Sequence, residues 1–169
     1  ITNPNQARAA AALVARFHGA LASSTHRFAF TRPGAHDTGA HMRALRAALT
    51  EHTDHRLSGA VMPMANEILT RWSDLPAAPT LPACIVHGDL KISNVLLDAQ
   101  DKAVGLIDLD TMAWSDLEVE LGDALRSWCS TTTEDAPDPE IDVNVFDAAV
   151  SGYAEASGGL APQVGHAFV

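Results

Sequence analysis

The sequence has 169 residues, about the length of one domain, and 47% of them are hydrophobic, enough to bury a core. Its formal net charge of -10 argues against a nucleic-acid partner, because phosphate backbones attract clustered Lys and Arg. No apolar run reaches the roughly 18 residues of a membrane span, and Cys84 and Cys129 form no CxxC pair, which fits a reducing cytoplasm.

The first half of the chain is expected to be helical. Asn3 and Pro4 are the residue types that favour an N-cap and a first helical position, and apolar residues follow them at helical spacing. Helices are predicted over residues 7–22, 41–51 and 61–72. The prolines that follow predict a stiff connector over residues 76–82.

The pattern then changes to short β-type runs. These runs cover residues 84–86, 95–97 and 104–107, and the turn-like residues between the second and third predict a hairpin. Helical spacing returns over 120–129 and 143–156. The predicted fold class is therefore α+β, a mainly helical lobe with one small β element.

The segment at residues 87–94 reads HGDLKISN and lies between two of the β runs. Phosphoryl transfer needs a carboxylate that orients the attacking hydroxyl and accepts its proton, and oxygen ligands that hold Mg²⁺ against the phosphates. Asp89 can serve as the base, and Asn94 lies at the far end of the same loop. Asp108 can reach the same edge, because Asn94 opens the predicted hairpin and Asp108 ends it.

This H-x-D-x-x-x-x-N pattern resembles the catalytic loop of protein kinases and of their relatives, the aminoglycoside phosphotransferase and choline kinase family. The glycine after the histidine is closer to the aminoglycoside phosphotransferases. The resemblance implies ATP and Mg²⁺ as cofactors and a small-molecule hydroxyl as acceptor. It further implies that Asp89 is the catalytic base, that Asn94 and Asp108 bind the metal and the nucleotide, and that Lys91 contacts the transferred phosphate.

Two further segments look like those of N-acetylhexosamine kinase-like members: IDLDT at 107–111 and LGDALR at 121–126. This similarity implies a sugar or amino sugar as the acceptor. In the family, the aspartate that matches Asp123 typically braces the catalytic loop. Asp110 either binds a second metal ion or caps the following turn.

Two other interpretations stay open. His87, Asp89, Asp108 and Asp110 could be the ligands of a metal-dependent phosphoesterase. The lobe could also be a pseudokinase that binds without catalysis, although Asp89, Asn94 and Asp108 are all present.

The resemblance covers residues 7–160, the C-terminal lobe of a kinase-like enzyme. No glycine-rich loop and no strand lysine precede residue 7, so the N-terminal lobe that grips ATP is expected to be absent from this chain. We then expect weak ATP binding and no phosphate transfer by residues 1–169 alone. An exposed apolar inter-lobe face would favour self-association.

Overall fold

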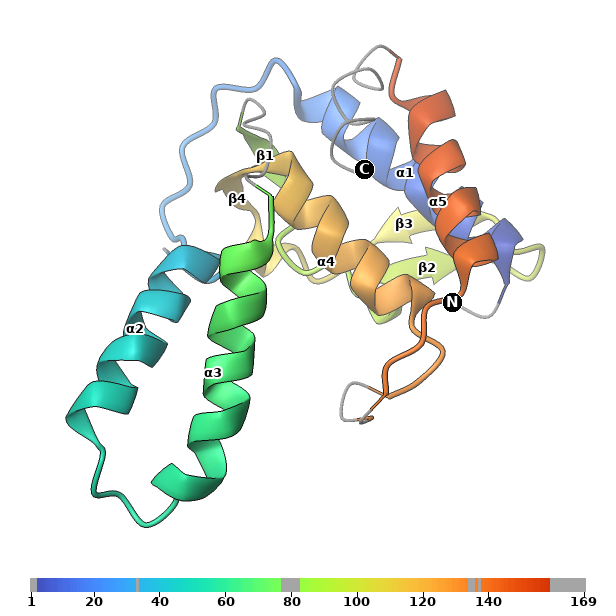
Figure 1. Cartoon of the computed structure of the whole chain (residues 1–169). Coiled ribbons are helices and arrows are strands. Elements are labelled where there is room, and N and C mark those ends of the chain that lie inside the picture. The colour runs from blue at the N-terminus through green and yellow to red at the C-terminus, as the bar shows by residue number, and fades with distance from the viewer. Residues whose placement is uncertain (1–2, 33, 77–82, 134–135, 137, 159–169) are drawn as a thin grey trace. The chain divides into compact units, whose positions relative to one another are not determined.

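The computed structural model describes residues 3–32, 34–76, 83–133, 136 and 138–158. The chain divides into two compact units. Residues 1–31 together with 79–169 form what we term the core unit, and residues 32–78 form the helical hairpin. Figure 1 labels the elements of both.

In the described part of the core unit the α-helices are α1 (Pro4–Leu21), α4 (Leu117–Cys129) and α5 (Val143–Ala156). Asn3 caps α1, because its side-chain oxygen accepts a hydrogen bond from the amide of Gln6 at 3.0 Å. Helices α1 and α5 lie side by side (Figure 1). A side chain on Gly152 would collide with the backbone of Arg8, so the glycine allows this close approach.

The described residues of the core unit also form two small antiparallel sheets. Strand β1 (Cys84–Val86) pairs with β4 (Ala113–Ser115), and β2 (Val95–Leu97) pairs with β3 (Ala103–Leu106). In the second sheet Val95 lies opposite Leu106. Asp98 fixes the hairpin turn, because its carboxylate accepts hydrogen bonds from the amides of Gln100 and Lys102, both at 2.9 Å.

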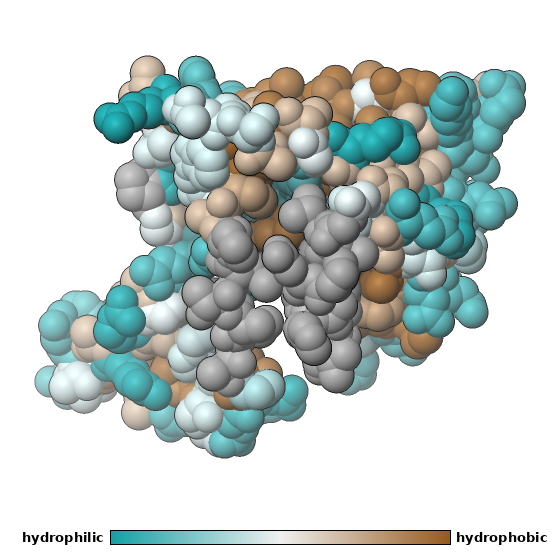
Figure 2. Space-filling model, turned by 90° about the horizontal axis from the view of Figure 1, so that it is seen from above, coloured by the Kyte–Doolittle hydropathy of each residue, from teal (hydrophilic) through white to brown (hydrophobic). Residues whose placement is uncertain are grey.

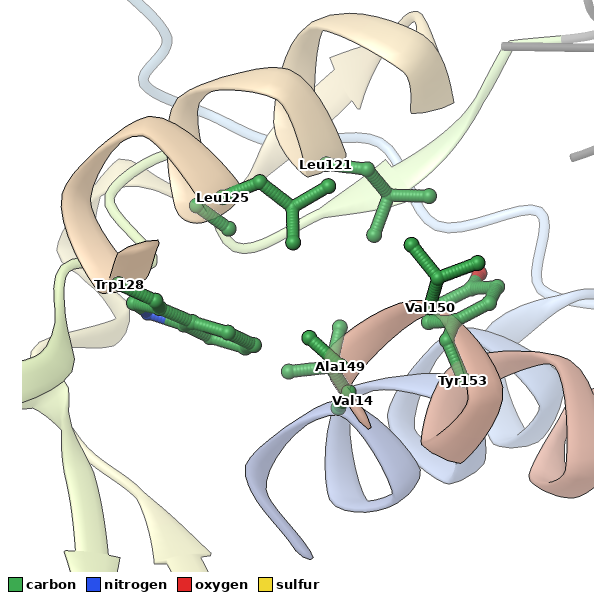
Figure 3. A pocket seen from close by; sticks show the side chains of 9 residues that line it. Val14, Leu121, Leu125, Trp128, Ala149, Val150 and Tyr153 are labelled. Atoms are coloured by element: carbon green, nitrogen blue, oxygen red, sulfur yellow. The ribbon is translucent and has the colours of Figure 1, made fainter. Parts of the chain in front are cut away.

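Apolar faces of α1, α4 and α5 meet in one hydrophobic core. Between these helices lies a cavity of about 10 Å³, which is too small for a ligand. Its lining side chains converge in Figure 3 and include Val14, Leu121, Leu125, Trp128 and Tyr153.

Both cysteines of the core unit are free thiols. Burial raises the pKa of Cys84 and of Cys129 to about 11, and nearby acidic groups act in the same direction.

The helical hairpin is built differently. It consists of α2 (Thr38–Glu51), capped by Asp37, and α3 (Ser58–Asp74), which contains Pro63. No residue of α2 is buried, although the structure describes the whole helix, and in α3 only Ala65 is. A groove of about 430 Å³ lies along the hairpin, lined by apolar residues with His52, His55 and Ser58.

Large apolar side chains also reach the surface. Figure 2 shows hydrophobic residues lying between hydrophilic ones on one face. In the hairpin unit the exposed large apolar side chains include Leu57, Val61, Met64 and Ile68. Among the described residues, none of the helices has the length and apolar character needed to cross a membrane.

The predicted α+β class is confirmed, as are the five long helices and the β2–β3 hairpin. The starts of α2, α3 and α4 lie three residues earlier than predicted. Strand β4 was not predicted, because it is stabilised by pairing with β1 rather than by a pattern of its own. Most of the predicted proline connector, residues 77–82, lies outside the described residues.

Candidate active site

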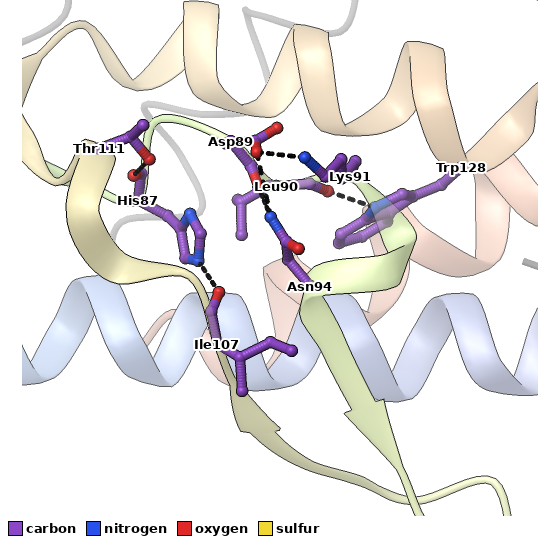
Figure 4. A network of polar contacts seen from close by, with 8 residues as sticks. All are labelled: His87, Asp89, Leu90, Lys91, Asn94, Ile107, Thr111 and Trp128. Atoms are coloured by element: carbon purple, nitrogen blue, oxygen red, sulfur yellow. Dashed lines mark hydrogen bonds and ion pairs between the residues drawn. The ribbon is translucent and has the colours of Figure 1, made fainter. Parts of the chain in front are cut away.

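The loop between β1 and β2 holds three polar side chains together (Figure 4). Lys91 donates from Nζ to Oδ2 of Asp89 at 2.6 Å. Asn94 donates from Nδ2 to the backbone carbonyl of Asp89 at 2.8 Å and to Oδ2 at 3.2 Å. The Asp89 carboxylate is therefore oriented from two sides, while about a third of its side chain stays exposed.

The backbone of this loop is anchored to the helices. A 3₁₀ turn, η1 (Ile92–Asn94), closes the loop, and Leu90 points into the core. Trp128 of α4 donates from its indole nitrogen to the carbonyl of Leu90 at 2.6 Å. Because Leu90 and Trp128 are both buried, this bond ties the residue after Asp89 to a fixed helix.

Gly88 is required by the conformation of the loop. Its φ is +82°, and a Cβ there would lie 2.6 Å from the carbonyl oxygen of Thr111. Thr111 in turn donates from Oγ1 to the carbonyl of His87 at 2.8 Å. The loop and the segment after β3 therefore approach each other closely and are joined by a hydrogen bond.

His87 is fully buried and orients the backbone. Its Nε2 lies 2.9 Å from the carbonyl oxygen of Ile107, which can only accept, so Nε2 carries the proton. Nδ1 of His87 is also buried, and it has no hydrogen-bond partner among the described residues. The contact of Nε2 therefore orients the ring and leaves the phosphoesterase interpretation, in which His87 is a ligand, to the assay described below.

Asp108 lies where β3 ends, next to Asn94. The amide of Ile107 donates to the carbonyl of Asn94 at 3.0 Å, which brings the two polar residues to the same edge of the hairpin. Asp108 has φ +67° and ψ +53°, a left-handed conformation that is uncommon outside glycine and is concentrated at functional sites. The 3₁₀ turn η2 (Leu109–Thr111), which contains Asp110, follows it.

Comparison with protein families agrees with this geometry. The model of the Phosphotransferase enzyme family matches residues 2–158. The chain belongs to this family. The match includes the loop at 87–94, and the family assigns phosphotransferase activity to the fold in general.

The charges in this candidate site influence one another. The hydrogen bond from Lys91 lowers the pKa of Asp89, and the charge of Lys91 and the Asn94 amide act in the same direction. The pKa of Lys91 is raised, chiefly by Asp89 and further by the charges of Asp108 and Asp110. The four predicted charged groups therefore share one electrostatic environment.

The donor set of this phosphotransferase suits Mg²⁺. The side-chain amide of Asn94 uses its nitrogen to donate to Asp89, and its oxygen can serve as a ligand. Asp108 offers a carboxylate at the same edge of the hairpin. Mg²⁺ is commonly bound through one or two protein carboxylates together with substrate phosphates. Among the described residues no three His, Cys, Asp or Glu side chains cluster closely enough to hold a metal ion by themselves.

One functional residue was missed from the sequence. Glu120 of α4 is buried, and its two carboxylate oxygens accept hydrogen bonds from the amides of His87 at 2.7 Å and Gly88 at 2.9 Å. The expectation that Asp123 braces the loop is wrong, because Asp123 instead pairs with Arg126 at 3.0 Å on the surface. Helical spacing contained the signal: Leu117, Glu120 and Leu121 share the buried face of α4.

Proposed function

We propose that the protein transfers the γ-phosphate of ATP to a hydroxyl group of a small molecule. The observation that carries this proposal is the orientation of the Asp89 carboxylate by Lys91 and Asn94 at the end of a buried, interlocked loop. A carboxylate held in this way, with one side open, suits a base that receives an acceptor hydroxyl.

In the proposed reaction the acceptor oxygen attacks the γ-phosphorus while the bond to the ADP oxygen breaks. The hydroxyl proton moves to Asp89. Lys91, which is half exposed and already paired with Asp89, contacts the transferred phosphate. Asn94 and Asp108 would hold Mg²⁺, with Asp110 close by, and the bound ion would neutralise charge on the phosphates.

For the acceptor we propose a sugar or amino sugar. The support is the resemblance of residues 107–111 and 121–126 to N-acetylhexosamine kinase-like members. Cationic acceptors such as choline or aminoglycosides stay within the proposed class and are the main competitors.

We further propose that residues 1–169 act as the catalytic-loop lobe of a two-lobed enzyme in the cytoplasm. Apolar side chains exposed around β2 and β3 support this arrangement, because they offer a face that another lobe, or a second copy of the chain, could cover. They are Leu96, Val104, Ile107 and Leu109.

The test is a coupled assay of ADP release by the full-length protein with ATP·Mg²⁺ and a panel of sugars, amino sugars, choline and aminoglycosides. Acceptor-dependent ADP release that is lost in Asp89→Asn supports the proposal. Phosphate release from monoesters without ATP would instead indicate a phosphoesterase. Nucleotide binding with no turnover on any acceptor would indicate a pseudokinase.

A further inference from the structure

A chain of buried polar side chains runs behind the catalytic loop. The hydroxyl of Tyr153 on α5 lies 2.9 Å from Nδ1 of His18 on α1. Nε2 of His18 lies 3.5 Å from Oε1 of Glu120 on α4. Glu120 holds the amides of His87 and Gly88. His18, Tyr153 and Glu120 are all at most 5% exposed.

The acceptors in this chain fix where its protons lie. Nε2 of His18 has no hydrogen-bond partner among the described residues, and we assign hydrogen to it because a carboxylate attracts an N–H rather than a lone pair. Nδ1 of His18 then accepts from the hydroxyl of Tyr153. At 3.5 Å the contact between His18 and Glu120 is an electrostatic one, beyond normal hydrogen-bond distance.

Glu120 needs this partner because a buried carboxylate is costly unless it is compensated. Two backbone amides of the loop and the imidazole of His18 surround it. The ring of Phe17 packs against both His18 and His87, at centroid distances of 5.5 and 6.5 Å. Without His18, Glu120 would lose the imidazole that faces its Oε1, and a carboxylate that turned away would loosen its hold on the loop amides.

We propose that His18 is a positioning residue: it fixes Glu120, which fixes the backbone of His87 and Gly88 and so the placement of Asp89. The catalytic consequence rests on the proposed function. The structural part, the link from α1 to the loop amides, can be measured without any activity.

Two matched substitutions distinguish the contribution of Nε2 of His18 from that of Nδ1. In His18→Gln the side-chain amide can reach the position of Nε2 and donate to Glu120. In His18→Asn the shorter amide reaches only the position of Nδ1, on the side of Tyr153. His18→Leu removes both polar contacts, and Tyr153→Phe removes only the hydroxyl.

The first measurement is amide hydrogen exchange of His87 and Gly88 by NMR, on each variant that keeps a cooperative thermal transition. Exchange of these two amides should be faster in His18→Asn and His18→Leu and close to wild type in His18→Gln. The ¹⁵N shifts of His18 should show hydrogen on Nε2. Unchanged exchange in His18→Asn, or no difference between the Gln and Asn variants, would overturn the proposal. Tyr153→Phe keeps it testable if the His18 variants do not fold, because it should also speed exchange at His87 and Gly88.

The second measurement is steady-state kinetics of the full-length protein. His18→Asn should lower kcat on the order of 10- to 100-fold, the usual cost of losing a residue that orients a functional group, while KM for ATP changes little. His18→Gln should recover most of kcat. A loss confined to KM would contradict the positioning role. If wild type phosphorylates no acceptor, the proposed function fails, and amide exchange still decides whether His18 fixes the loop.

Discussion

The core unit and the helical hairpin are both built largely from helices, but they differ in how far those helices are buried. The core unit buries α1, α4 and α5 against one another and uses that rigidity to hold the loop of Asp89. The hairpin at 32–78 buries almost nothing in α2 and α3 and leaves an apolar groove open. The geometry of the Asp89 loop therefore depends on the packed unit, whereas the helices of the hairpin are largely exposed.

The two units also differ in net charge. The hairpin segment holds five Arg and five Asp or Glu and is neutral, so the remaining residues carry the whole net charge of -10. An acidic core unit and a neutral, apolar hairpin suit different contacts: the first favours metal ions and cationic groups, and the second favours apolar ones.

The largest effect should come from Asp89. In the full-length protein Asp89→Asn should lower turnover by about 10²–10⁴, the range for loss of a general base, with ATP affinity retained. Glu67→Gln in the hairpin is the control, because Glu67 only pairs with Arg71 on the surface. Turnover of Asp89→Asn within a few-fold of wild type would remove Asp89 from its role.

A matched pair of leucines tests the difference in packing. Leu121 is buried in the core unit, so Leu121→Ala should cost about 2–5 kcal/mol of unfolding free energy. Leu49 lines the hairpin groove and is half-buried, so Leu49→Ala should cost about 1 kcal/mol or less. Urea denaturation followed by circular dichroism measures both. Equal losses of unfolding free energy in the two variants would contradict the difference in packing between the two units.

Gly88 and Gly59 form a second pair. Gly88→Ala places a side chain at φ +82° against the carbonyl of Thr111, so we expect a loss of about 1–3 kcal/mol and reduced turnover. At Gly59 in the first turn of α3 a Cβ would meet no atom within 4 Å, and Gly59→Ala should stabilise the hairpin by up to about 1 kcal/mol. Thermal melts of both variants test whether stability falls in Gly88→Ala and rises in Gly59→Ala.

The smallest effect is a shift in pH dependence. The hydrogen bond from Lys91 lowers the pKa of Asp89, and the base must be ionised to act, so the acid limb of kcat should lie below the ordinary carboxyl pKa of about 3.9. In Lys91→Met that limb should move to higher pH. A limb that stays in place would show that Lys91 does not set this pKa.

The same pair gives a stability signature. Because the folded pKa of Asp89 is depressed, its contribution to stability is present above about pH 3.9 and is lost as the pH falls through the folded value. The raised pKa of Lys91 makes its contribution complete below about pH 10.4 and lost as the pH rises through the folded value. The difference in unfolding free energy between wild type and Lys91→Met should therefore be full between these limits. It should decline outside them and vanish once the pH passes the folded pKa of Asp89 on the acid side or of Lys91 on the basic side.

Local chemistry made much of the fold predictable. Asn3 and Pro4 predicted the start of α1, and the β runs on either side of residues 98–101 predicted the β2–β3 hairpin. Both predictions were possible because caps and turns depend on neighbouring residues. The HGDLKISN segment indicated where the site lies for a similar reason: its side chains are close in sequence.

Features that depend on distant contacts were not predictable. Strand β4 needs β1 as its partner, and the left-handed backbone of Asp108 has no sequence pattern outside glycine. Helical spacing indicates that Glu120 lies on the apolar face of α4, but that this face meets the loop amides depends on distant contacts, and Glu120 was overlooked in favour of Asp123.

The raised thiol pKa values have a practical consequence for labelling. With a pKa of about 11, only about 10⁻⁴ of Cys84 or Cys129 is thiolate at pH 7, and the thiolate is the form that reacts with maleimides. A single cysteine introduced at an exposed hairpin position such as Ser73 would therefore be modified almost alone. A fluorophore placed there would report the melting of the hairpin separately from that of the core unit, without removal of either native cysteine.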